Sequence, residues 1–94
     1  MMTAIDQLVE HYAHNDAVFS KEFRQEKERL DVAAALMQLR KETGLSQREL
    51  AERANKPQST IARIESGRMN ATISLLEQIA ASVNKRVHIS FVDA

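Results

Sequence analysis

Apolar residues recur at helical spacing through most of the chain, and this pattern predicts a mainly helical protein. Residues 5–12 place their apolar side chains on one face of a first helix, which Thr3 would cap. Residues 21–29 form a mixed charge run that suits a solvated helix face. The pattern leaves open whether a separate helix begins at Ser20 or one helix runs on.

The apolar spacing tightens from Leu30, where it predicts a helix that packs into the core. Gly44 follows at the position where a left-handed residue commonly ends a helix. Met37 is expected to pack in the core. The apolar stripe has offsets of three, four and seven residues and consists of Leu30, Ala33, Ala34, Met37 and either Leu36 or Arg40.

A short helix is predicted directly after this glycine. Ser46 and Glu49 have the spacing of a capping box, in which each side chain bonds the backbone of the other residue. Leu50, Ala51 and Ala54 would form the inner face of the helix. The small side chains of the two alanines allow a second helix to cross it closely.

A second short helix is predicted to begin at Pro57, because the missing N–H of proline suits the first helical position. Ile61 and Ile64 would face inward. Two short helices joined by a tight turn form a helix-turn-helix unit, here from Leu45 to Gly67. Glutamine, serine and arginine on its outer face are side chains that bind base edges in the major groove of DNA. The side chains left on that face are Gln58, Ser59, Ala62 and Arg63.

The last part of the chain changes from helical to alternating spacing. Thr72 would cap a helix that stops near Asn84, a residue type that tolerates left-handed backbone. Beyond it Val87, Ile89 and Phe91 alternate with polar residues and predict one strand. Because no second strand is evident, we expect it to pair with the same strand of a second copy. The predicted fold is therefore all-α, a bundle of roughly five helices with one C-terminal strand paired across a homodimer.

Composition narrows the functional classes. The chain has no Cys, which excludes disulfides and thiolate metal sites. No signal-peptide pattern is present, and no apolar run nears the roughly 20 residues of a membrane span, so we expect a cytoplasmic protein without a membrane partner. Residues 1–31 carry 7 acidic and 4 basic side chains, and residues 40–70 carry 4 acidic and 7 basic ones. This split predicts two partners, one of them bearing phosphates, although chance imbalance on solvated helices also explains the acidic part.

The segments LSQRELAERA, from Leu45, and QSTIARIESG, from Gln58, resemble the Xre/Cro/C1-repressor family of helix-turn-helix domains. The resemblance covers about residues 30–83 and implies a lambda-repressor-like fold that binds double-stranded operator DNA and represses transcription. It implies that Gln47 bonds a phosphate and braces Gln58. The DNA-contacting residues that it implies are Gln47, Gln58, Ser59, Thr60, Arg63, Ser66 and Arg68.

Three positions of the motif carry further expectations from this resemblance. Glu65 matches a structural acid that pairs with a basic residue of the domain rather than with DNA. Asn55 stands where many relatives have Gly, and it also tolerates positive φ. Pro57 stands where a polar residue is commoner and removes one backbone N–H from phosphate contact.

Outside the motif, the chain is similar to the HigA-type antitoxins of type II toxin-antitoxin systems. This resemblance implies an N-terminal helical arm at 1–29, a DNA-binding domain at 30–84 and a dimerisation strand at 85–94, with Val87, Ile89 and Phe91 in the dimer. The acidic arm would hold a basic RelE/HigB-like RNase toxin. Its apolar anchors, which are also compatible with core packing, would be Leu8, Tyr12, Phe19 and Phe23. A stand-alone repressor without a toxin stays an alternative.

An enzyme is the alternative from another class. His11 and His14, with Glu10 beside them, have a weak metal-ligand spacing, and exposed helix and turn positions explain them better. The sequence contains neither a Gly-rich phosphate loop nor a nucleophile motif. We therefore expect no catalytic activity, no metal and no cofactor.

Overall fold

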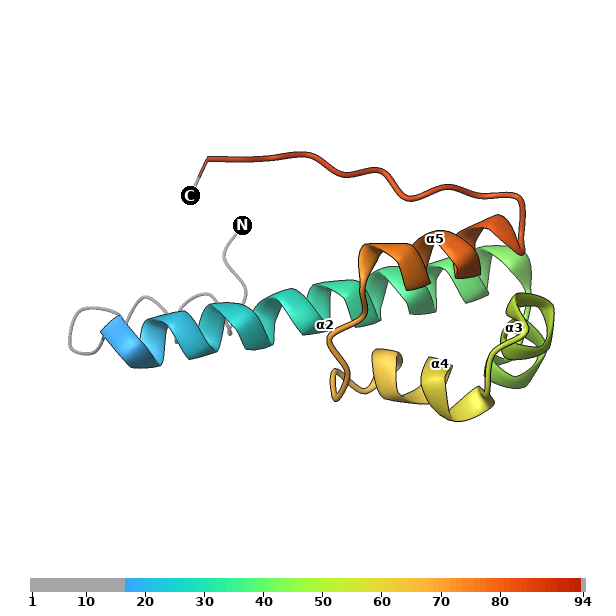
Figure 1. The fold of residues 1–94 in the computed structure, drawn as a ribbon, viewed down its shortest axis with the longest axis horizontal. Coiled ribbons are helices and arrows are strands. Elements are labelled where there is room, and N and C mark those ends of the chain that lie inside the picture. The colour runs from blue at the N-terminus through green and yellow to red at the C-terminus, as the bar shows by residue number, and fades with distance from the viewer. Residues whose placement is uncertain (1–16, 94) are drawn as a thin grey trace.

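A computed structural model of the chain describes residues 17–93, with side chains from residue 21 onward. Its helices are α2 (Ala17–Thr43), α3 (Gln47–Ala54), α4 (Gln58–Glu65) and α5 (Ile73–Ala81). The second half of α2 packs with the three short helices, while its first half projects beyond them (Figure 1). The helix predicted over residues 5–12, and His11 and His14 with it, lie outside the described residues.

The longest helix, α2, is continuous over 27 residues. Its charge run of Lys, Arg, Glu and Gln contains good helix formers and neither Gly nor Pro, so nothing breaks the helix at Ser20. The boundary predicted between the N-terminal arm and the DNA-binding domain, at residues 29 and 30, falls inside this helix. At its end, the Thr43 hydroxyl donates to the carbonyl of Leu39 over 2.9 Å, and Leu45 N–H donates to the Arg40 carbonyl over 3.1 Å.

Each described helix is followed within three residues by a residue with positive φ. The left-handed turn lets the next backbone N–H groups reach the last free carbonyls of the helix. The residue that follows the left-handed one donates its backbone N–H to such a carbonyl. Examples are Lys56 N–H to Ala51 O at 2.9 Å and Arg68 N–H to Arg63 O at 3.0 Å. The four φ angles are 71° at Gly44, 56° at Asn55, 74° at Gly67 and 59° at Asn84. The helix ends predicted at Gly44 and Asn84 are therefore confirmed.

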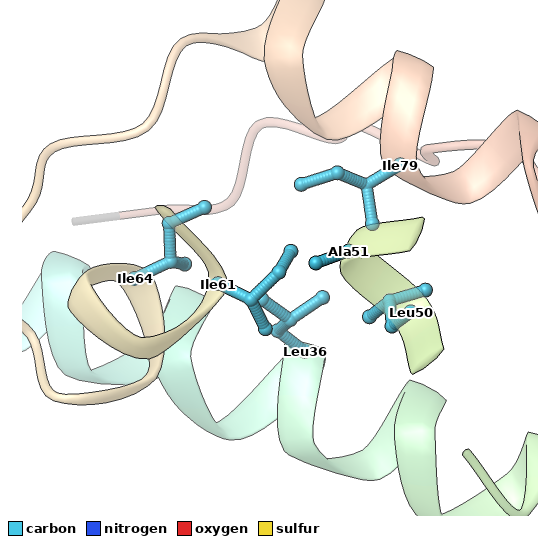
Figure 2. Packing of buried hydrophobic residues seen from close by; sticks show 6 residues of the cluster. All are labelled: Leu36, Leu50, Ala51, Ile61, Ile64 and Ile79. Carbon is cyan, nitrogen blue, oxygen red and sulfur yellow. The ribbon is translucent and has the colours of Figure 1, made fainter. Parts of the chain in front are cut away.

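The core lies where α2, α3, α4 and α5 meet (Figure 2). The inward positions predicted for the two motif helices are confirmed, because Leu50, Ile61 and Ile64 are fully buried and Ala51 is 2% exposed. The buried apolar side chains of this core cluster are Leu36, Leu50, Ala51, Ile61, Ile64 and Ile79.

The core position predicted for Met37 is wrong. Met37 is 46% exposed, whereas its neighbour Leu36 is 4% exposed and belongs to the core cluster. Adjacent residues differ by about 100° around a helix, and packing of α2 against α4 selects the face that contains Ala33 and Leu36. Leu30, at 37% exposed, and Ala34 also lie outside the buried face.

The predicted C-terminal strand is not present in the structure, and the described part of the chain contains four helices and no strand. After Asn84 the chain reverses and runs back past α5 as an irregular segment (Figure 1). The physical reason is that a strand requires a backbone partner, and no described segment of this single chain runs beside residues 85–93 as one.

Candidate nucleic-acid interface

The capping box predicted at the start of α3 is confirmed. The Ser46 hydroxyl accepts from Glu49 N–H over 3.0 Å, and Ser46 N–H donates to Glu49 Oε1 over 3.1 Å. The backbone N–H of Ser46 and its side chain, as hydrogen-bond partners of the Glu49 carboxylate, lower the pKa of Glu49. The two bonds of the capping box also fix where α3 begins, so that Gln47 becomes its first residue.

The turn between α3 and α4 is built by Asn55 and Pro57. Asn55 takes the left-handed conformation, as expected for an Asn that stands where many relatives have Gly. Pro57 was predicted as the first helical residue, but its φ of −61° and ψ of 144° are extended, so it is the N-cap, one position before the helix. Its carbonyl accepts from Thr60 N–H over 3.0 Å, and α4 begins at Gln58.

The side of α4 that faces away from the core carries the predicted base-reading side chains. Gln58, Ser59 and Arg63 are exposed, while Thr60 is half-buried at the edge of this face. The face is held in place because Ile61 and Ile64, on the opposite side, are fully buried against α2 and α3. We call Gln58, Ser59, Ala62 and Arg63 the outer row of α4; Ala62 is its half-buried member.

The loop after α4 continues this surface. Ser66 and Arg68, the predicted backbone-contacting residues, are both exposed. The Ser66 hydroxyl donates to the Arg63 carbonyl over 3.1 Å. Gly67 between them is buried, and a Cβ there would stand 3.2 Å from Leu30 Cδ2. The loop therefore closes tightly onto α2 and turns the two polar side chains outward.

Glu65, the last residue of α4, pairs with a basic residue of the domain as predicted, and that residue is Arg40 of α2. Arg40 Nε donates to Glu65 Oε2 over 2.6 Å, and Arg40 Nη2 donates to Oε1 over 2.8 Å. The Glu65 side chain is 3% exposed and that of Arg40 24%. Burial raises the pKa of Glu65, but the hydrogen bonds from Arg40 and Gln47 outweigh it and lower the pKa overall.

The Glu65 carboxylate also holds Gln47. Gln47 Nε2 donates to Glu65 Oε1 over 3.1 Å, and Arg40 Nη1 donates to the Leu45 carbonyl over 3.2 Å. This cluster of Arg40, Glu65 and Gln47, here called the Arg40 cluster, joins α2, α3 and α4. The sequence did not identify Arg40 as the partner. The signal that could have done so is its place four residues after Leu36, on the buried face of α2.

The site therefore consists of two short helices, α3 and α4. The second of them, α4, presents the polar outer row to solvent, and α3 begins next to that row. A model of the helix-turn-helix family, of the Xre/Cro/C1 type, matches residues 36–87, more than half of the chain. The chain belongs to the helix-turn-helix family. This family binds DNA and is not an enzyme family, so the helix-turn-helix protein is a DNA-binding transcription regulator. Comparison with curated proteins and with solved structures gives no match.

Of the predicted toxin-binding and dimerisation residues, those that the structure describes lie away from this interface. Leu8 and Tyr12 are outside the described residues, as is the side chain of Phe19, and Phe23 is partly exposed on α2. Val87 is half-buried, while Ile89 is 54% and Phe91 101% exposed. Among the described helices, none is both long and apolar enough to span a membrane.

Proposed function

We propose that the protein is a sequence-specific operator-binding repressor whose α4 enters the major groove. Gln58, Ser59 and Arg63 read base edges, because glutamine pairs with adenine, arginine with guanine, and serine with either. Thr60 supports them at the edge of the row. Gln47, Ser66 and Arg68 bind the phosphates on either side. The observation that carries this proposal is the exposed outer row of α4, anchored from behind by the buried Ile61 and Ile64.

The repressor acts as a homodimer, with Val87, Ile89 and Phe91 of the C-terminal segment between the copies. Two copies of α4 then enter successive major grooves about 34 Å apart, and the operator is a pseudo-palindrome. The exposure of Ile89 and Phe91 on one short segment supports this dimer, because neighbouring exposed apolar side chains commonly mark an interaction site.

The same protein is proposed to be a HigA-type antitoxin that neutralises a basic RelE/HigB-like RNase in the cytoplasm and represses its own operon. The acidic first third of the chain supports this role. In the projecting half of α2, Glu22, Glu26 and Glu28 are exposed among the basic residues of the same mixed charge run. A positively charged toxin surface would complement these carboxylates.

The operator-binding role is tested by selecting sites from a random DNA pool with the full-length protein. The proposal expects a pseudo-palindrome whose two halves are separated by about one helical turn. Recovery of unrelated sequences with equal affinity would show non-specific binding and overturn it.

The antitoxin role is tested by co-expressing the tagged chain with the protein encoded beside it. We expect co-purification and rescue of growth, both lost in Glu22→Lys/Glu28→Lys. The matched control is Glu42→Lys/Glu77→Lys, which changes the charge equally at exposed positions of α2 and α5 and should retain rescue. No complex and no toxic neighbour would leave a stand-alone repressor.

A further inference from the structure

An apolar groove lies between α2, α5 and the C-terminal segment. Its volume is about 420 Å³. Val32, Leu36 and Leu39 of α2 line it together with Leu76, Ile79 and Ala80 of α5. Residues 85–88 form its outer wall, so the groove exists only because the chain turns back after Asn84.

The same C-terminal segment carries apolar side chains that are largely exposed. Ile89 is 54% exposed, Phe91 is 101% exposed and Val92 is 86% exposed. Phe91 is four residues beyond Val87 and so lies up to about 13 Å farther along the chain. The Phe91 side chain therefore lies beyond the groove that Val87 lines and does not enter the groove of its own copy.

We propose that the groove of each copy is filled by Phe91 from the second copy, in a reciprocal exchange of the C-terminal segments. The inference rests on the proposed homodimer and specifies its contacts. If two segments run antiparallel about a two-fold axis at Ile89, residue 91 of one copy stands opposite residue 87 of the other. Directly opposite residues of antiparallel segments have Cα atoms only about 4.5–5.5 Å apart. Phe91 thus arrives beside Val87, at the mouth of the groove.

The surface involved approaches the size that a stable dimer needs. A buried phenylalanine ring removes about 150–250 Å² from water, and the groove that covers it loses a similar area. Two such contacts come to roughly 600–1,000 Å². The paired backbones and the Ile89 side chains at the axis bring the total toward the approximately 1,200 Å² of a specific interface.

The test uses Phe91→Trp, because the chain contains no other Trp. The proposal expects blue-shifted emission that moves to the exposed wavelength on dilution, in step with dissociation measured by sedimentation. Blue-shifted emission in a monomer would mean that the chain fills its own groove, which overturns the exchange. Exposed emission in a protein that still dimerises and binds its operator would also overturn it, and would leave the proposed function standing.

A matched pair of variants tests the floor of the groove. Ala35 and Ala34 are adjacent exposed residues of α2, but only Ala35 lines the groove. Ala35→Glu should raise the dimer dissociation constant at least about tenfold, because a carboxylate would face the incoming ring. Ala34→Glu should change it less than about twofold, in the range of ordinary surface substitutions. Equal effects of the two variants would contradict the proposal.

The register is tested by disulfide formation, since the protein has no native Cys. Ile89→Cys should crosslink to its own copy across the axis. Val87→Cys should not, because its two copies would be more than about 7 Å apart. A mixture of Val87→Cys and Phe91→Cys should give the mixed disulfide. Efficient self-crosslinking of Val87→Cys would overturn the register.

Discussion

Glu65→Gln tests the Arg40 cluster, which fixes the two motif helices relative to α2. The substitution keeps the size of the side chain and removes its charge. Arg40 then has one acceptor in place of two, and the new amide donors face Arg40 and Gln47, which are themselves donors. The variant therefore leaves a guanidinium without its counter-charge in a largely buried site.

The magnitude follows from burial. Removing one partner of a fully buried ion pair destabilises a protein by about 3–5 kcal/mol. Arg40 is 24% exposed, so water partly solvates its charge in the variant, and the remaining amide oxygen still accepts one bond. We therefore expect a loss of about 2–3 kcal/mol in the free energy of unfolding, measured by urea titration at pH 7 and fixed protein concentration.

Glu52→Gln is the matched control, because Arg48 and Glu52 form an ion pair with exposed side chains, at 77% and 66%. Exposed pairs contribute about 0–1 kcal/mol, so this variant should stay within about 0.5 kcal/mol of the wild type. If Glu65→Gln were no more destabilising than Glu52→Gln, the cluster would not stabilise the fold and the reasoning would be refuted.

The pH dependence of the same comparison has a definite sign. The pKa of Glu65 is lowered in the folded state, so its ionised form stabilises the fold above the unfolded value of about 4.3. That contribution is lost as the pH falls through the lower folded-state pKa. The gap between wild type and Glu65→Gln should therefore be constant from pH 7 to about pH 5 and shrink in more acidic solution. A gap that widens in acid would contradict this assignment.

Three further predictions concern the helix ends and the DNA. Gly44→Ala should destabilise the fold by about 1–2 kcal/mol through left-handed strain alone. Gly67→Ala should cost up to about 1 kcal/mol more, because its Cβ meets Leu30. Equal losses in thermal unfolding would argue against the close approach. Ser46→Ala should lower the unfolding free energy by about 1 kcal/mol through loss of the α3 cap, whereas Ser74→Ala, at an exposed position within α5, should stay within about 0.5 kcal/mol. Operator affinity should fall with salt at a log–log slope near −7 for about four phosphates per protomer, and Arg68→Ala should flatten it to about −5; an unchanged slope in fluorescence anisotropy would remove Arg68 from the phosphate contacts.

Local chemistry made much of the motif predictable from the sequence. The capping box at Ser46, the left-handed turns at Gly44 and Asn84, and the inward Ile61 and Ile64 each depend on a residue type and its near neighbours. The outer row of α4 followed, because the polar side chains are what remains when the apolar face is placed.

Features set by tertiary packing were not predictable in the same way. The stripe with Met37 and the face with Leu36 have similar helical spacing, and only the position of α4 selects between them. Glu65 was expected to pair within the domain, but its partner Arg40 lies 25 residues away, and local spacing does not reach that far. The C-terminal alternation could not reveal that its backbone has no partner within one chain.

The most direct test of the account is whether Arg63 of the outer row reads a base. Affinities of the wild type and Arg63→Ala should be compared for the selected operator and for each of its single-base variants, with Lys21→Ala, an exposed cation of the projecting half of α2, as control. The account predicts that Arg63→Ala weakens operator binding by about 1–3 kcal/mol and loses discrimination at one position of each half-site, while Lys21→Ala keeps the full profile. A uniform loss of affinity across all sequences, with discrimination unchanged at every position, would contradict it.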